Sequence, residues 1–114
     1  MLDLTNIRQI AGGDESFVKG ILQVFLTKEA EYSEGINREL AAKNYYELRQ
    51  VVHKIKSSIS VLGMSDFKTR LNRLEKGMEN GELSEEEISS GAKEVHQEFM
   101  HSLTLVRDFL QTMP

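Results

Sequence analysis

Apolar residues at helical spacing run through almost the whole chain, and no proline interrupts them. The only proline is Pro114 at the very C-terminus, so no helix has to kink or break at a proline. Apolar residues recur at intervals of three and four, and no stretch shows the alternating pattern of a half-buried strand. The sequence therefore predicts an all-α fold made of long helices.

Capping residues and glycines divide this pattern into five expected helices. Asp14 and Asn44 have the side chains of N-caps, and Ser84 with Glu87 three residues later forms a capping box. Ser65 or Asp66 is expected to cap the helix that lies between Gly63 and Gly81. Glycines follow most of the helices, at Gly12-Gly13, Gly63 and Gly81, where a left-handed residue ends a helix readily. The expected helices span residues 4–11, 15–42, 45–62, the segment after Ser65 or Asp66 up to residue 79, and 85–111.

The connections between the four longer helices are short, which forces neighbouring helices to run antiparallel. We expect an antiparallel up-down-up-down four-helix bundle, with the short N-terminal helix closing one end. A chain of 114 residues makes one domain with one continuous core. Residues 1–114 are therefore expected to form a single domain.

The composition excludes several classes of function. A net charge of −4 and the lack of a basic stripe argue against nucleic acid as a partner. No stretch approaches the roughly 18 consecutive apolar residues of a membrane-spanning helix. The first residues lack the basic and apolar regions of a secretory signal, and the chain has no cysteine. We expect a cytoplasmic protein without a membrane anchor.

The helix expected at residues 45–62 carries one exposed histidine opposite its buried stripe. At about 100° per residue, His53 falls on the opposite side from the apolar residues Leu48, Val52, Ile55, Ile59 and Leu62. Gln50, Ser57 and Ser60 share the face of His53, and Lys56 lies one turn onward. A neutral imidazole can attack phosphorus, a cation can hold phosphoryl oxygens, and small neighbours leave room for a partner. This face has the residues that phosphoryl transfer needs.

Each of these residues also has a purely structural interpretation. A lone histidine on a helix is more often only a surface residue, and Lys56 alone would be a solvated lysine. His96 and His101 are five residues apart, which does not put them on one helix face as a metal pair. We expect both to be surface or boundary residues. Met64, Met78 and Met100 are expected to fill the core rather than to hold a cofactor.

Residues 53–58, HKIKSS, followed by Leu62-Gly63, resemble the signature of histidine-containing phosphotransfer (HPt) domains. That signature has His, any residue, an aliphatic residue, Lys, Gly and small residues before a Leu-Gly helix end. Residues 12–17 and the helix exit at residues 40–44 are similar to the family pattern as well, so the resemblance covers most of residues 4–81. The last expected helix is similar only in length and polarity.

The resemblance implies roles for four residues and identifies one departure from the family. His53 would be phosphorylated, and Lys56 would stabilise the charge of the phosphoryl group. Ser57 stands where the family usually has glycine, which gives a partner's active site room to close over the imidazole; the change bears on rate and partner choice. In similar domains a polar side chain on the following helix orients the histidine, and the corresponding position here is Glu75.

The implied function is that of a phosphorelay intermediate. His53 would accept a phosphoryl group from an aspartate of one response-regulator receiver domain and pass it to another, and a hybrid sensor histidine kinase would be a further partner. The receiver domain brings its own Mg²⁺, so no cofactor or metal is expected in this chain, which is expected to be a monomer. Because no glycine-rich phosphate loop is present, we expect a phosphotransfer intermediate rather than an ATP-using kinase.

Two other functions stay open at this point. A non-catalytic helical adaptor would keep the fold and bind a receiver or kinase domain without accepting phosphate, and Ser57 is the hint in its favour. A generic helical bundle that mediates oligomerisation is the third interpretation. Detection of an acid-labile, base-stable phosphohistidine separates the first function from the other two.

Overall fold

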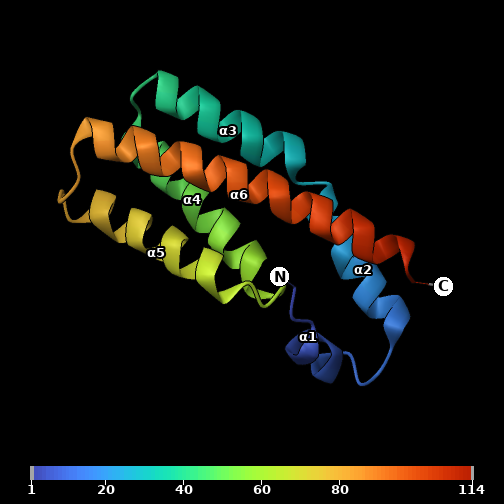
Figure 1. The fold of residues 1–114 in the computed structure, drawn as a ribbon. Helices are drawn as coiled ribbons and strands as arrows, with labels where there is room; N and C mark the ends of the chain where they lie inside the picture. Colours follow the sequence, from blue (N-terminus) through green and yellow to red (C-terminus); the bar gives the residue numbers. More distant parts are fainter. Residues whose placement is uncertain (1, 114) are drawn as a thin grey trace.

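The computed structural model describes residues 2–113, and this part of the chain contains six helices and no strand (Figure 1). The prediction of an all-α fold is confirmed. None of these helices is both long enough and apolar enough to cross a membrane. The helices are α1 (Thr5–Ile10), α2 (Glu15–Leu26), α3 (Glu29–Ala41), α4 (Tyr45–Ser60), α5 (Ser65–Glu79) and α6 (Glu85–Gln111).

Helices α3 to α6 form the expected antiparallel four-helix bundle. The connections between them are three to five residues long, so each helix turns back along its predecessor. α4 packs against α3 and α5, and α6 packs against α2, α3 and α5. α6 is 27 residues long and runs the length of the molecule, whose longest dimension is 46 Å. α1 and α2 lie at the end of the bundle that holds the C-terminal half of α6 (Figure 1).

The prediction of one continuous helix over residues 15–42 is wrong, because a turn at residues 27–28 separates α2 from α3. After Phe25 the apolar stripe should continue at position 28 or 29, but Lys28 and Glu29 stand there and the stripe resumes only at Tyr32. The backbone N–H groups of Thr27 and Lys28 bond to carbonyls three residues back, at 3.0 and 3.1 Å. The backbone therefore forms a tighter, 3₁₀-like turn at residues 27–28. This is the point at which the helix has no apolar side chain to bury.

Most of the expected helix ends are confirmed. The side chain of Asp14 accepts hydrogen bonds from Ser16 N and Phe17 N, and Asn44 Oδ1 accepts one from Glu47 N. Ser84 and Glu87 form both hydrogen bonds of the capping box. These side chains satisfy N–H groups that have no partner within the helix.

The prediction that Ser65 or Asp66 caps α5 is wrong. The residue at the cap position is Met64, which makes no side-chain capping bond, and Ser65 is already the first residue of the helix. The left-handed turn at Gly63 leads almost directly into α5, so both polar residues fall inside its first turn. The side chain of Met64 is buried in the core instead.

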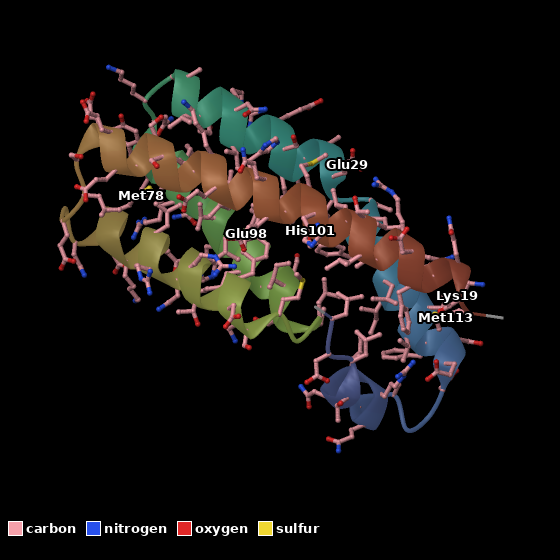
Figure 2. The ribbon with its side chains drawn as sticks, viewed as in Figure 1. Lys19, Glu29, Met78, Glu98, His101 and Met113 are labelled. Atoms are coloured by element: carbon pink, nitrogen blue, oxygen red, sulfur yellow. The ribbon has the colours of Figure 1, made fainter. Side chains whose placement is uncertain are left out.

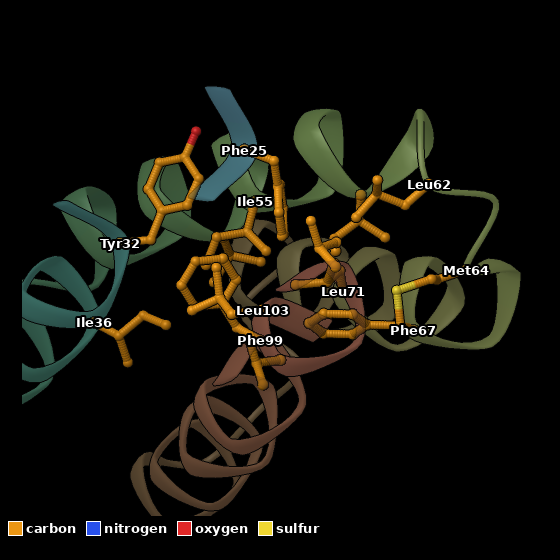
Figure 3. Close-up of a cluster of buried hydrophobic side chains, with 14 of the residues drawn as sticks. Phe25, Tyr32, Ile36, Ile55, Leu62, Met64, Phe67, Leu71, Phe99 and Leu103 are labelled. Atoms are coloured by element: carbon orange, nitrogen blue, oxygen red, sulfur yellow. The ribbon is translucent and has the colours of Figure 1, made fainter. Parts of the chain in front are cut away.

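The core joins every helix and fixes the rotation of α4 about its axis. The ring of Phe99 on α6 packs edge-on against Phe25, with centroids 5.8 Å apart, and against Tyr32 at 5.6 Å (Figure 3). The expected stripe is fully buried, and it consists of Leu48, Val52, Ile55 and Ile59 of α4 and of Leu62 just after the helix. Rotating α4 would expose this stripe to water, so the opposite face of the helix has to face solvent.

The turn after α4 is fastened to the N-terminal segment. Asp3 N donates a hydrogen bond of 2.9 Å to the carbonyl of Leu62. Gly63 has a φ of 65°, and a Cβ atom at this residue would lie 2.1 Å from the carbonyl oxygen of Asp3. Glycine is therefore required here for two reasons: the backbone is left-handed, and the N-terminal segment at Asp3 approaches it closely.

We predict that Gly63→Ala lowers the free energy of unfolding by about 3 kcal/mol or more, because it adds a clash with backbone to the cost of the left-handed conformation. The control is Gly81→Ala, where φ is 68° and nothing lies within 4 Å of the added Cβ. That variant should lose only about 1–2 kcal/mol. Urea unfolding measures both, and equal losses would contradict the role given to the Asp3 carbonyl.

Candidate functional site

His53 lies at the middle of α4 on the face opposite the buried stripe. Its side chain is 57% exposed, as the helical phase of the sequence predicts. The neighbours of its buried side, Val52 and Ile55, are fully buried and hold the backbone in place. The imidazole is therefore a solvent-accessible group on a rigid support.

A buried carboxylate from α5 joins His53 to Lys56. Glu75 Oε2 lies 2.7 Å from His53 Nδ1, and Glu75 Oε1 accepts a hydrogen bond of 2.8 Å from Lys56 Nζ. The side chain of Glu75 is only 7% exposed. We call these three residues the His53–Glu75–Lys56 cluster.

The contact with Glu75 determines which imidazole nitrogen is free. A carboxylate can only accept hydrogen bonds, so Nδ1 of His53 must carry the proton that it shares with Glu75. In the neutral ring the lone pair then belongs to Nε2, on the other side of the imidazole from Glu75. Nε2 is the nitrogen available to a partner.

The two partners of Glu75 keep it ionised. Burial by itself would raise the pKa of Glu75, but the hydrogen bonds from Lys56 and His53, together with their charges, outweigh burial and hold the pKa below its usual value. A buried carboxylate without these partners would tend to take up a proton. The cluster therefore supports a negative charge beneath the imidazole.

Lys56 is held by α5 more closely than its place in the sequence suggests. Its ammonium donates to Asn72 Oδ1 at 3.3 Å as well as to Glu75, and its side chain is 19% exposed. Lys56 borders the same hollow as His53, but both of its hydrogen bonds are directed toward α5. Its contact with the histidine runs through Glu75.

The serines near His53 bond to their own helix. Ser57 Oγ donates to the carbonyl of His53 at 3.2 Å, and Ser60 Oγ donates to the carbonyl of Lys56 at 2.9 Å. Ser58 faces α3 instead, where its hydroxyl lies 3.2 Å from Tyr32 Oη. Ser57 thus places a small hydroxyl one turn after the imidazole, with its polar atom already paired.

A shallow polar hollow between α4 and α5 surrounds the histidine. We call it the His53 hollow, and its lining residues are Arg49, Gln50, His53, Lys56, Glu75, Lys76 and Glu79. Sequence reasoning did not single out Arg49, Lys76 and Glu79. Arg49 stands four residues before His53, which was a usable signal. Lys76 and Glu79 come from α5, and only the packing of α4 on α5 brings them here.

The other two histidines lie on α6, away from the His53 hollow. His96 Nε2 is 2.7 Å from Ser33 Oγ, a contact that joins α6 to α3. His101 is exposed on the edge of α6 that faces α5, near Glu98 (Figure 2). Glu98 itself pairs with Arg70 of α5. Both histidines are boundary or surface residues, as expected.

Comparison with known proteins gives one match. A family model described as "Hpt domain" matches residues 20–113. No curated protein and no solved structure matches this chain. The matched range includes all of α6, which the resemblance in the sequence covered only in length and polarity, and it leaves out the first 19 residues, part of which the resemblance had included.

We predict that Glu75→Gln lowers the free energy of unfolding at pH 7 by about 1–3 kcal/mol, because His53 and Lys56 lose a charged acceptor. The folded-state pKa of Glu75 lies below the ordinary value of 4.5. Its stabilisation is therefore complete above pH 4.5 and disappears as the pH falls through the lower folded-state pKa.

Urea unfolding of both proteins between pH 7 and pH 3 measures this difference. Glu34→Gln, at an exposed position of α3, is the control and should stay within about 0.5 kcal/mol of the wild type. A difference between wild type and Glu75→Gln that does not change with pH would contradict the proposed charge on Glu75.

Proposed function

Because this chain belongs to the Hpt domain family, whose members take part in histidine phosphotransfer, we propose that it is a phosphorelay intermediate and that His53 carries the phosphoryl group. The observation that carries this proposal is the orientation of the imidazole. Nδ1 is held by a buried carboxylate, and Nε2 is on the exposed side of a half-exposed ring. Such a ring presents its nucleophilic nitrogen to a partner.

The proposed reaction is a direct transfer between an aspartyl phosphate and the imidazole. The Nε2 lone pair of His53 attacks phosphorus, a P–N bond forms, and the bond from phosphorus to the aspartate oxygen breaks as the carboxylate leaves. The ring gains positive charge and keeps its Nδ1 proton toward Glu75. Transfer onward is the same step in reverse, with a second aspartate as the nucleophile.

Glu75 and Lys56 have supporting parts in this reaction. The carboxylate of Glu75 lies 2.7 Å from Nδ1, where it stabilises the positive ring that forms on attack. Lys56 keeps Glu75 ionised through its hydrogen bond of 2.8 Å and adds positive charge at the border of the His53 hollow. Lys56 thus has two effects: its positive charge attracts the phosphoryl group, and its hydrogen bond keeps Glu75 ionised.

The proposed partners are receiver domains of response regulators, with a hybrid sensor histidine kinase as a further partner. Mg²⁺ at the transfer step is expected to come with the receiver domain. Tyr46, which is exposed, stands seven residues before His53 and so lies on the same face of α4, where it offers an apolar contact for a partner. We propose that the chain works as a cytoplasmic monomer and does not use ATP.

We predict that incubation with a phosphorylated receiver domain and Mg²⁺ labels the wild type and leaves His53→Gln unlabelled. The readout is an acid-labile, base-stable phosphohistidine. His101→Gln is the control, because His101 is an exposed histidine on another helix, and it should be labelled like the wild type.

Undiminished labelling of His53→Gln would rule out the assigned site. Binding of the receiver domain without any phosphohistidine would favour the alternative function, a non-catalytic adaptor, which the serine at position 57 also favours.

We predict that Ser57→Gly accelerates transfer from the receiver by roughly two- to tenfold, since it removes the side chain one turn after the imidazole. The helix should lose about 0.5 kcal/mol of stability, because glycine is a weaker helix former than serine. Ser60→Gly, at the last residue of α4, is the control: it also removes a serine hydroxyl that bonds to its own helix, at a greater distance from His53, and should cost less helix stability. A transfer rate of Ser57→Gly that equals that of the control would show that the serine does not restrict access.

A further inference from the structure

Arg49 and Lys76 face the His53 hollow from two different helices and share one carboxylate oxygen. Glu79 Oε2 lies 3.5 Å from Arg49 Nη1 and 3.7 Å from Lys76 Nζ. An anionic oxygen thus already sits between a guanidinium and an ammonium, in the hollow that holds the histidine. This is the environment that an oxygen of a phosphoryl group requires.

Arg49 is more readily available to a new anion than Lys56 is. Lys56 is committed to the buried Glu75 and to Asn72, and its withdrawal would leave Glu75 with one partner fewer. The pair of Arg49 and Glu79 is longer and lies nearer the surface, where ion pairs contribute little to stability. An incoming phosphoryl group can exchange with Glu79 at little cost.

Helix geometry places Arg49 one turn before His53 on the same face of α4. Residues four apart share a face, and side chains lean toward the N-terminus of their helix, so His53 leans over the turn that contains Arg49 and Gln50. The guanidinium of Arg49 rests on the ring of Tyr46, 5.5 Å from its centroid, and its side chain is 26% exposed. Arg49 therefore offers a supported planar donor group in the hollow that His53 also lines.

The charges around the hollow favour a single added anion in place of Glu79. Its lining has three cations and two carboxylates, so it carries one positive charge in excess when the imidazole is neutral. A phosphoryl group adds about −1.5 to −2. Glu79 is the last residue of α5 and is exposed, so its side chain can turn toward water when that charge arrives.

We propose that Arg49 binds the phosphoryl group of phosphorylated His53, with Lys76 in support, and that Glu79 occupies this oxyanion subsite until the phosphoryl group displaces it. The proposal rests on the proposed function of His53 and adds to it the group that holds the phosphoryl oxygens. Arg49 then sets how the phosphoryl group is divided between His53 and the aspartate of a receiver domain.

The test phosphorylates the full chain in two ways and compares three variants. Phosphoramidate, a small donor, transfers its phosphoryl group to Nε2 as the P–N bond to ammonia breaks, and no docking is involved. A phosphorylated receiver domain with Mg²⁺ gives the equilibrium between His53 and aspartate. The readouts are that equilibrium and the ³¹P resonance of the phosphohistidine, for Arg49→Gln, Glu79→Gln and the double variant.

Arg49→Gln should lower the equilibrium fraction on His53 by roughly three- to tenfold and shift the ³¹P resonance, because a charged donor is lost. Glu79→Gln should raise that fraction by roughly two- to threefold, since the competing carboxylate is gone. In the double variant, the loss of Glu79 should not raise the fraction on His53 above that of Arg49→Gln, because the arginine for which Glu79 competes is absent. Arg73→Gln, an arginine of α5 that faces the groove with α6, is the matched control and should behave like the wild type.

The outcomes separate this proposal from the one on which it rests. Failure of both donors to phosphorylate wild-type His53 would overturn the proposed function and this inference with it. Phosphorylation of all variants with unchanged equilibrium and ³¹P resonance would overturn the Arg49 subsite alone, as would a loss in Lys56→Gln that Arg49→Gln does not share. If Arg49→Gln does not fold, Glu79→Gln alone tests the subsite, because an unchanged fraction on His53 in that variant would also overturn it.

Discussion

The carboxylate of Glu75, buried between α4 and α5 and bonded to both His53 and Lys56, is the interaction on which the site depends. A buried charge is costly unless it is paired, so the carboxylate needs both partners and fixes both of them in return. It holds the imidazole in one tautomer and one orientation and leaves Nε2 outside. One contact with the next helix thus orients the ring of an exposed histidine, the group that we propose carries the phosphoryl.

The rest of the fold serves to keep α4 and α5 in the register that this contact needs. The apolar stripe of α4 is fully buried, which sets the rotation of the helix. Gly63 lets the chain turn within a few residues and lets the backbone of Asp3 approach the end of α4. α6 then packs against α2, α3 and α5 and closes the core. The site itself is shallow and polar because the tight packing lies beneath it.

The sequence predicted most of the fold, and its errors have physical causes. Periodicity and caps gave the four-helix bundle, the exposure of His53, the start of α4 and both ends of α6, whereas α4 ends at Ser60, two residues before the expected end. The break between α2 and α3 was missed because neither glycine nor proline marks it; the only signal was one turn without an apolar residue, at Lys28 and Glu29. Ser65 and Asp66 were taken as caps on residue type alone, whereas the turn geometry at Gly63 decided where α5 begins.

The sequence alone determined which side chains share a face with His53, since positions four apart on a helix are neighbours whatever the fold. It also carried the family resemblance, through residues 53–58. The resemblance also pointed to Glu75 on the next helix, but only the tertiary structure decided the contacts across from that face. The pairing of Glu75 with Nδ1, the commitment of Lys56 to α5, and the meeting of Arg49 with Lys76 and Glu79 all depend on how α5 packs on α4. No spacing along a single helix encodes that register, because it is set by the core that both helices share.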